Sequence, residues 1–194
     1  NIMATEVSIC SNALRKLGDD PITSLTEDTE RARLCNGLYV PARDAILRSH
    51  PWNFAITRAS LARLSATPAY GFTYQYALPA DPYCLRVLEM EYQDYIFKIE
   101  HLAGTGRVLL TDESTAKILY IGKITDTNQF DSLFVDTLTA KMALDLAYAI
   151  TNSVKVQENM YNLLQAKFSE ARSVDGQEGF IDNLVSDTFT DFRK

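Results

Sequence analysis

Hydrophobic positions between residues 131 and 152 occupy more than one side of a predicted helix. They spread further around the circumference than the single stripe of a surface helix. Ser132 is a suitable N-cap, and Asn152 tolerates the left-handed conformation that ends many helices. We therefore predict a central helix that is largely buried against several neighbours. Its apolar residues are Phe134, Val135, Leu138, Met142, Leu144, Leu146, Tyr148, Ala149 and Ile150.

Apolar residues at spacings of three and four also predict two helices near the start of the chain. The first spans residues 5–17. The second must end by His50, because Pro51 disfavours helical geometry in the residue before it. Ser24 and Glu27 have the spacing of a capping box, so we predict that they start this second helix.

A fourth helix is predicted to begin after Ser153, to end at Gly176 and to pack antiparallel to the central helix. Beyond it, hydrophobic residues are set among aspartates in residues 177–194. Apolar anchors in an acidic terminal segment are typical of a piece that docks, either on its own domain or on a neighbouring subunit. The candidate interface residues in this tail are Phe180, Ile181, Leu184, Phe189 and Phe192.

The hydrophobic period changes to two from Trp52 onward, which is typical of β-strands. The predicted strands lie within residues 52–57, 70–78, 85–90, 96–110 (a hairpin that reverses at Gly104-Thr105-Gly106) and 117–121. The predicted fold class is α+β, with helices segregated from strands. Residues 1–51 and 131–176 form an antiparallel helical bundle, residues 52–130 an inserted antiparallel β region, and residues 177–194 an extended C-terminal docking tail.

One predicted strand is rich in aromatic residues. A platform on which nucleic-acid bases stack would interleave such residues with Arg and Lys. Here small or uncharged residues alternate with the aromatic ones, so we predict a sheet core or a subunit interface. The candidate interface residues of this strand are Tyr70, Phe72, Tyr74 and Tyr76.

Composition narrows the possible functions. The 194 residues include 19 basic and 25 acidic ones, and the net charge of −6 argues against a surface that binds phosphate backbones. No apolar run approaches the ~20 residues that span a bilayer, and we expect no signal peptide, with Met3 as the natural start. The three cysteines are far apart in sequence, and we expect them to be free, mostly buried thiols.

The sequence offers little catalytic chemistry. His50 lies at a helix end, where a cap-like role is favoured over catalysis, and His101 lies near a predicted hairpin tip. The Gly104-Thr105-Gly106 turn resembles a nucleotide-binding loop, but Leu109 stands where the third glycine would fall. The acidic residues 19–30 lack the spacing of a calcium loop, so a solvated face is expected. We predict no catalytic, cofactor-binding or metal-binding residues, and no enzymatic activity.

An ordered series of motifs nevertheless resembles a known family. The run from Arg43 to Ala55, followed by Arg58 and Leu61, closely resembles the tail tubular protein A family of short-tailed bacteriophages. The other matching segments are Ala13-Leu14, Leu17-Gly18, Ile22 to Leu25, Tyr76 to Asp81, Arg86-Val87, Tyr120-Ile121, Phe130-Asp131, Phe134, Ala147, Ile150-Thr151, Ala171 and Asp175 to Glu178. The resemblance spans nearly the whole chain, and its specificity lies in the order and spacing of these segments.

The resemblance implies a structural virion protein: a head-to-tail adaptor, also called a gatekeeper. Members of the family form a ring of twelve that docks on the portal protein and carries the tail nozzle or tail fibre proteins. DNA passes through the ring without specific binding, and the chain would be made in the cytoplasm of the bacterial host. The resemblance thus implies a virion tail localisation, self-association and no membrane contact.

Two other functions stay open on the sequence alone. One is a head-tail connector of a long-tailed phage, which would share the helical-bundle architecture but bind a different partner below the ring. The other is a small hydrolase that uses His50 or His101, a reading that the sparse catalytic chemistry disfavours.

Overall fold

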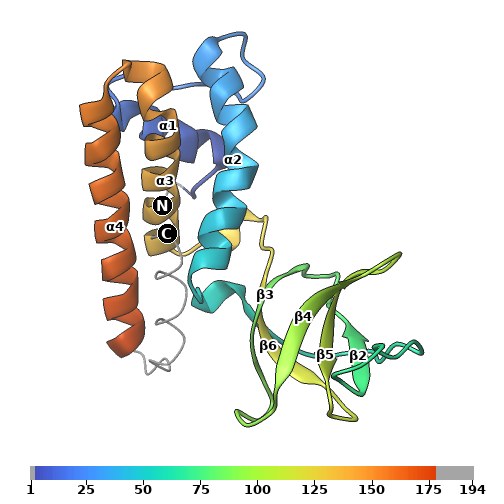
Figure 1. The fold of residues 1–194 in the computed structure, drawn as a ribbon. Helices are drawn as coiled ribbons and strands as arrows, with labels where there is room; N and C mark the ends of the chain where they lie inside the picture. Colours follow the sequence, from blue (N-terminus) through green and yellow to red (C-terminus); the bar gives the residue numbers. More distant parts are fainter. Residues whose placement is uncertain (1–2, 178–194) are drawn as a thin grey trace. The chain divides into compact units, whose positions relative to one another are not determined.

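The computed structural model describes the backbone of residues 3–177 and the side chains of residues 3–174. Helices and two small antiparallel sheets make the fold α+β, as predicted (Figure 1). The chain divides into a helical unit, residues 1–46 and 126–194, and a β unit, residues 47–125. The predicted boundaries lie at 51/52 and 130/131. The predicted docking tail, with Phe180, Ile181, Leu184, Phe189 and Phe192, lies outside the described residues.

Helix α1 (Glu6–Lys16) forms where the spacing predicts it. Its N-terminus is capped by Thr5, whose hydroxyl accepts a hydrogen bond from the backbone N–H of Ser8 at 3.0 Å. Gly18 follows the helix at φ +79°, a left-handed conformation that glycine adopts without a steric penalty. The buried face consists of Ile9, Cys10, Ser11, Ala13 and Leu14.

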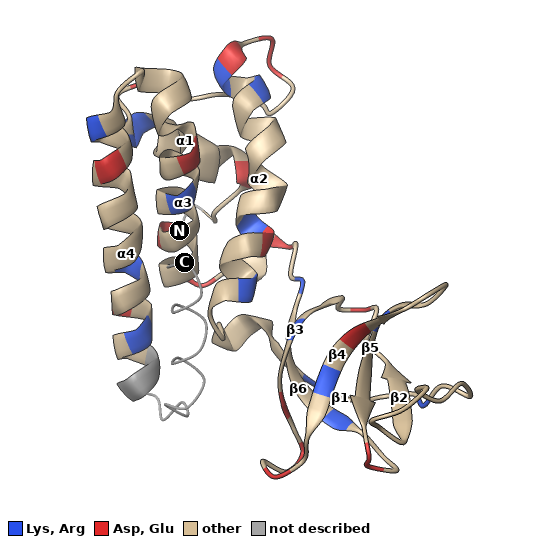
Figure 2. Cartoon of the chain, in the orientation of Figure 1, with Lys and Arg blue, Asp and Glu red and all other residues tan. Residues whose placement is uncertain are grey.

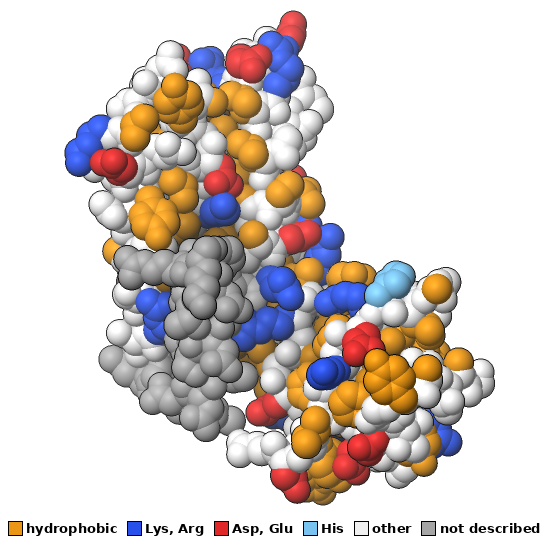
Figure 3. All heavy atoms as spheres, in the orientation of Figure 1, with side chains coloured by type: hydrophobic (Ala, Val, Ile, Leu, Met, Phe, Trp, Pro, Cys, Tyr) orange, Lys and Arg blue, Asp and Glu red, His pale blue; other side chains and the backbone are white. Residues whose placement is uncertain are grey.

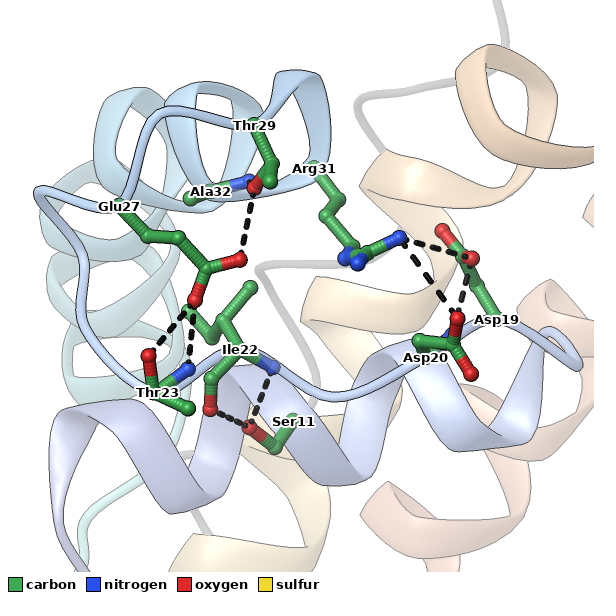
Figure 4. Close-up of polar contacts among 9 residues, drawn as sticks. All are labelled: Ser11, Asp19, Asp20, Ile22, Thr23, Glu27, Thr29, Arg31 and Ala32. Atoms are coloured by element: carbon green, nitrogen blue, oxygen red, sulfur yellow. Dashed lines mark hydrogen bonds and ion pairs between the residues drawn. The ribbon is translucent and has the colours of Figure 1, made fainter.

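Helix α2 (Glu30–Ser49) starts later than the sequence predicts. The predicted capping box of Ser24 and Glu27 is wrong, because the Glu27 carboxylate binds Thr23 in the preceding loop (Figure 4). The Thr29 hydroxyl instead accepts a hydrogen bond from the backbone N–H of Ala32 at 3.3 Å, in the manner of an N-cap. The helix ends before His50, as the position of Pro51 predicts.

The central helix α3 (Ser132–Thr151) is the most hydrophobic of the four helices in the described part of the chain. Asp131, and not the predicted Ser132, caps it: the carboxylate accepts a hydrogen bond from the backbone N–H of Phe134 at 2.7 Å. Asn152 ends the helix at φ +54°, which confirms the predicted left-handed cap. Fully buried residues lie on several sides of α3, namely Phe134, Thr137, Leu138, Ala140, Met142, Ala143, Leu146 and Ala147.

Helix α4 (Val154–Gln177) packs antiparallel to α3, as predicted (Figure 1). The turn between them is short because Asn152 reverses the chain and the hydroxyl of Ser153 accepts a hydrogen bond from the N–H of Val156 at 3.2 Å. Leu164, Phe168 and Ala171 form the buried face of α4. Helix α1 also contacts α3, so α3 is the element around which the helical unit is built.

The β unit contains two antiparallel sheets of three strands, in the orders β1-β6-β3 and β2-β5-β4. The strands are β1 (Ile56–Ser60), β2 (Tyr74–Ala77), β3 (Cys84–Met90), β4 (Phe97–Leu102), β5 (Gly106–Thr111) and β6 (Lys117–Gly122). Two predicted strands begin later than expected. Asn53–Ala55 form a 3-10 turn before β1, and residues 70–73 precede β2 without joining the sheet.

The core of the β unit is shared by both sheets. Tyr76 and Leu109 come from one sheet, whereas Met90, Ile118 and Tyr120 come from the other. Residues 61–64 bridge the two sheets. The N–H of Leu61 donates to the carbonyl of Ala116, just before β6, and the N–H of Leu64 donates to the carbonyl of Gln75 in β2. The β4–β5 hairpin turns at Gly104, as predicted.

Candidate interaction surfaces

The structure divides the four aromatic candidates of residues 70–76 by their exposure. Tyr76 is buried, with 1% of its surface exposed, and its hydroxyl donates a hydrogen bond to the carbonyl of Glu113 at 2.7 Å. It therefore belongs to the sheet core, and the prediction of Tyr76 as an interface residue is corrected. Tyr76 falls in the core because β2 is paired along one edge with β5 and contributes inward side chains to both sheets' shared interior.

The other three candidates lie nearer the surface. Phe72 and Tyr74 are half-buried, and the Arg63 guanidinium carbon lies 4.8 Å from the centre of the Tyr74 ring. Tyr70 is 89% exposed. A contact with another molecule can therefore involve Tyr70 directly, and Phe72 and Tyr74 through their exposed edges.

A second surface lies on the helical hairpin formed by α3 and α4. Tyr148 on α3 and Tyr161 on α4 are 51% and 53% exposed. Next to Tyr161 lies a surface hollow of about 450 Å³. It is lined by Leu144, Gln157, Glu158, Tyr161 and Asn162. We call Leu144, Tyr148, Tyr161 and this hollow the hairpin surface.

The apolar pattern of the central helix predicts that Leu144 and Tyr148 are buried, and for Tyr148 this prediction is wrong. Charged residues on the same side of α3 indicate that Tyr148 is exposed. Lys141 and Asp145 form an ion pair at 2.9 Å, and they precede Tyr148 by seven and three residues. Residues at such spacings share one helix face, so the face that carries this ion pair is the one exposed to solvent.

Charged residues elsewhere in the helical unit form surface ion pairs. The guanidinium of Arg31 lies 3.6 Å from the carboxylate of Asp19 and 4.0 Å from that of Asp20 (Figure 4). Arg33 pairs with Asp28 at 2.7 Å. The predicted acidic face of residues 19–30 is thus partly neutralised by arginines of α2. Among the described residues, no group of three or more His, Cys, Asp or Glu side chains is arranged to hold a metal ion.

The two histidines occupy different environments. His50 is buried, and its ring centre lies 4.6 Å from that of Trp52 in an edge-to-face arrangement. Its carbonyl accepts a hydrogen bond from the backbone N–H of Trp52 at 2.9 Å, so the residue forms part of the turn that ends α2. His101 is exposed on β4, opposite Arg107 on β5.

All three cysteines are free and buried, as predicted. A hydrogen bond with the Cys35 thiol, together with burial, raises the pKa of Cys10. Burial also raises the pKa of Cys84. A thiol with a raised pKa is protonated near neutral pH and is a poor nucleophile.

Hydrophobic side chains are also exposed over the strands of the β unit, on the face drawn in Figure 3. The largest exposed ones in this unit are Tyr70, Tyr83, Tyr92 and Ile96. Within the described residues, no helix is both long enough and apolar enough to span a bilayer.

No protein-family model matches the chain, and no curated protein matches it either.

Proposed function

We propose that this chain is the head-to-tail adaptor of a short-tailed bacteriophage, a structural protein that forms a ring of twelve copies between the portal and the tail. The proposal starts from the ordered motifs that resemble the tail tubular protein A family. The α+β architecture supports it, because the resemblance implies a helical bundle interrupted by an inserted β region. The β unit is inserted between the two segments of the helical unit, as that family's architecture requires.

The hairpin surface is the observation that carries the proposal. A central helix buried on several sides is a rigid support, and it carries one exposed tyrosine while α4 carries another. Tyrosine is enriched at protein interfaces because its ring buries a large apolar area while its hydroxyl keeps a hydrogen-bond partner. In a ring, each subunit meets its two neighbours through different faces, so such a surface would contact a second, non-identical patch.

The charge distribution also suits a conduit for DNA. The net charge is −6, and Figure 2 shows acidic and basic residues mixed along α4 without a long stripe of one sign. A protein that grips DNA through its phosphates needs clustered basic residues, because each neutralised phosphate contributes to affinity. An acidic chain would let DNA slide past without sticking.

A binding experiment with a portal ring tests the proposal. The purified chain is mixed with the portal ring of a short-tailed phage and separated on a density gradient, with a portal ring from a long-tailed phage as the control. We expect the chain to co-migrate with the first ring only. Co-migration with the long-tailed ring alone would select the connector of long-tailed phages instead, and co-migration with neither would contradict the proposal.

A further inference from the structure

Three arginines of the β unit lie around one short stretch of backbone. The Arg48 Nε donates to the carbonyl of Leu85 at 3.2 Å, and the Arg107 Nη1 donates to the same carbonyl at 3.4 Å. The Arg107 Nη2 also donates to the carbonyl of Cys84. The Arg86 Nη1 donates to the carbonyl of Arg48 at 3.2 Å. We call Arg48, Arg86 and Arg107 the arginine cluster.

The irregular start of β3 makes this arrangement possible. The pairing of β3 with β6 shifts register between Cys84 and Arg86. A bulge of this kind turns carbonyl groups out of the ladder, where side chains can bind them. The carbonyls of Cys84 and Leu85 therefore serve as acceptors for Arg107.

The cluster concentrates positive charge without compensation. Within the described part of the chain, no carboxylate forms an ion pair with Arg48, Arg86 or Arg107, and their acceptors are backbone carbonyls. Burial, together with the charge of Arg48, lowers the pKa of Arg86. Each guanidinium has five N–H donors, so most of the donors in the cluster have no acceptor within the described residues.

The cluster is accessible and has an aromatic neighbour. Arg48 is exposed, whereas Arg86 and Arg107 are half-buried. The Tyr83 ring is 51% exposed, and the Arg107 guanidinium carbon lies 5.6 Å from its centre. A ligand that combines carboxylates with aromatic rings would match both features, because guanidinium groups bind carboxylates in pairs of hydrogen bonds and stack on rings.

We propose that the arginine cluster is the binding site for the acidic C-terminal segment of this chain, residues 178–194. Four carboxylate side chains lie in that segment, at Glu178, Asp182, Asp187 and Asp191, and three phenylalanines accompany them. A 17-residue peptide can span up to roughly 60 Å, long enough to bind a neighbouring copy. This inference goes beyond the adaptor proposal and does not depend on it, since the segment can bind with or without a ring.

Photo-crosslinking of the full chain tests this binding. Benzoylphenylalanine replaces Phe189, and the crosslinked peptides are mapped by mass spectrometry. We expect crosslinks in the peptides that contain residues 83–86 and 107. Mixing heavy-isotope and normal chains then shows whether the segment comes from the same copy or from a neighbour, and either origin supports the proposal.

Charge variants decide whether the arginines cause the binding. The Arg48 side chain is exposed and donates a single hydrogen bond, to the carbonyl of Leu85, so Arg48→Glu is the least disruptive change in the cluster. We expect it to lower the crosslink yield about tenfold, as for the loss of a charge-assisted contact. Arg58→Glu makes the same charge change on an exposed residue of β1 and serves as the control, with a yield within about twofold of the wild type.

Neutralising the segment keeps the test independent of the fold of the β unit. The triple variant Asp182→Asn, Asp187→Asn and Asp191→Asn should lower the yield as strongly as Arg48→Glu. An unchanged yield in this triple variant would overturn the proposal, as would crosslinks that map only to α3 and α4. DNA binding is tested by the retarded migration of a DNA duplex mixed with the chain. If Arg48→Glu abolished this retardation and left the crosslink yield intact, the cluster would be a DNA site and the proposal would be overturned.

Discussion

The Glu27 carboxylate accepts two hydrogen bonds from Thr23, from its backbone N–H at 2.8 Å and from its hydroxyl at 2.9 Å (Figure 4). A third hydrogen bond to this carboxylate comes from the hydroxyl of Thr29 at 3.1 Å. These contacts close the loop between α1 and α2. They also lower the pKa of Glu27, with the Thr23 backbone N–H as the largest cause.

The depressed pKa of Glu27 makes the loop sensitive to acid. A carboxyl whose folded pKa lies below its ordinary value of 4.5 stabilises the fold above that pH, and the contribution is lost as the pH falls through the folded pKa. We expect Glu27→Gln to lower the free energy of unfolding at pH 7 and to lose less stability than the wild type below pH 4.5. Urea unfolding at a series of pH values measures this. Parallel pH profiles for the two proteins would contradict it.

Two glycines should respond to alanine in opposite ways. A Cβ at Gly122 would lie 2.9 Å from the Cβ and Cγ of Pro82, whereas a Cβ at Gly37 in α2 would meet nothing within 4 Å. Gly122→Ala should therefore destabilise the protein by about 1–3 kcal/mol through overpacking. Gly37→Ala should stabilise it by roughly 0.5–1 kcal/mol, because alanine loses less backbone entropy in a helix. Thermal unfolding of both variants distinguishes the two signs, and equal shifts would refute the packing argument.

Tyr76 should behave as a core residue. Tyr76→Phe removes the hydroxyl that binds the carbonyl of Glu113, which should cost about 1 kcal/mol of unfolding free energy. Tyr70→Phe makes the same chemical change on a ring that is 89% exposed, so it should leave stability within about 0.5 kcal/mol of the wild type. Chemical denaturation of both variants provides the comparison. An equal effect of the two changes would argue against the core assignment.

Stability and assembly should separate on α3. Leu146 is fully buried, so Leu146→Ala should destabilise the chain by about 2–5 kcal/mol. Tyr148 is 51% exposed, and Tyr148→Ala should change stability by less than about 1 kcal/mol.

If the hairpin surface contacts a neighbouring copy, the double variant Tyr148→Ala with Tyr161→Ala should fold normally and lose its association with other copies of the chain. Full association of this variant would exclude the hairpin surface from the interface.

The sequence predicts the elements of this fold better than their ends. The spacing of apolar residues identifies each helix of residues 3–177 and the β4–β5 hairpin, because burial on one side imposes a regular period. For α2 and α3 the sequence predicts the wrong N-caps. Several residues near each helix start can act as a cap. The choice depends on which side chains are already bound within the preceding loop, as the Glu27 carboxylate is bound to Thr23.

Surface residues are harder to identify than core residues. Tyr76 and Tyr148 have the same residue type and both lie in apolar runs, yet one is buried and the other exposed. The sequence does not predict the arginine cluster, because its members come from three separate elements, α2, β3 and β5, which only the fold brings together. No local pattern in the sequence marks such a cluster.

The mass of the chain in solution tests the adaptor proposal most directly. Light scattering would be measured on the purified chain alone and then on the chain mixed with the portal ring of a short-tailed phage. We expect a complex that contains one copy of the 21.8 kDa chain for each portal subunit, whether or not the chain is monomeric alone. A chain that stays monomeric at 21.8 kDa in the presence of the portal ring would contradict the proposal.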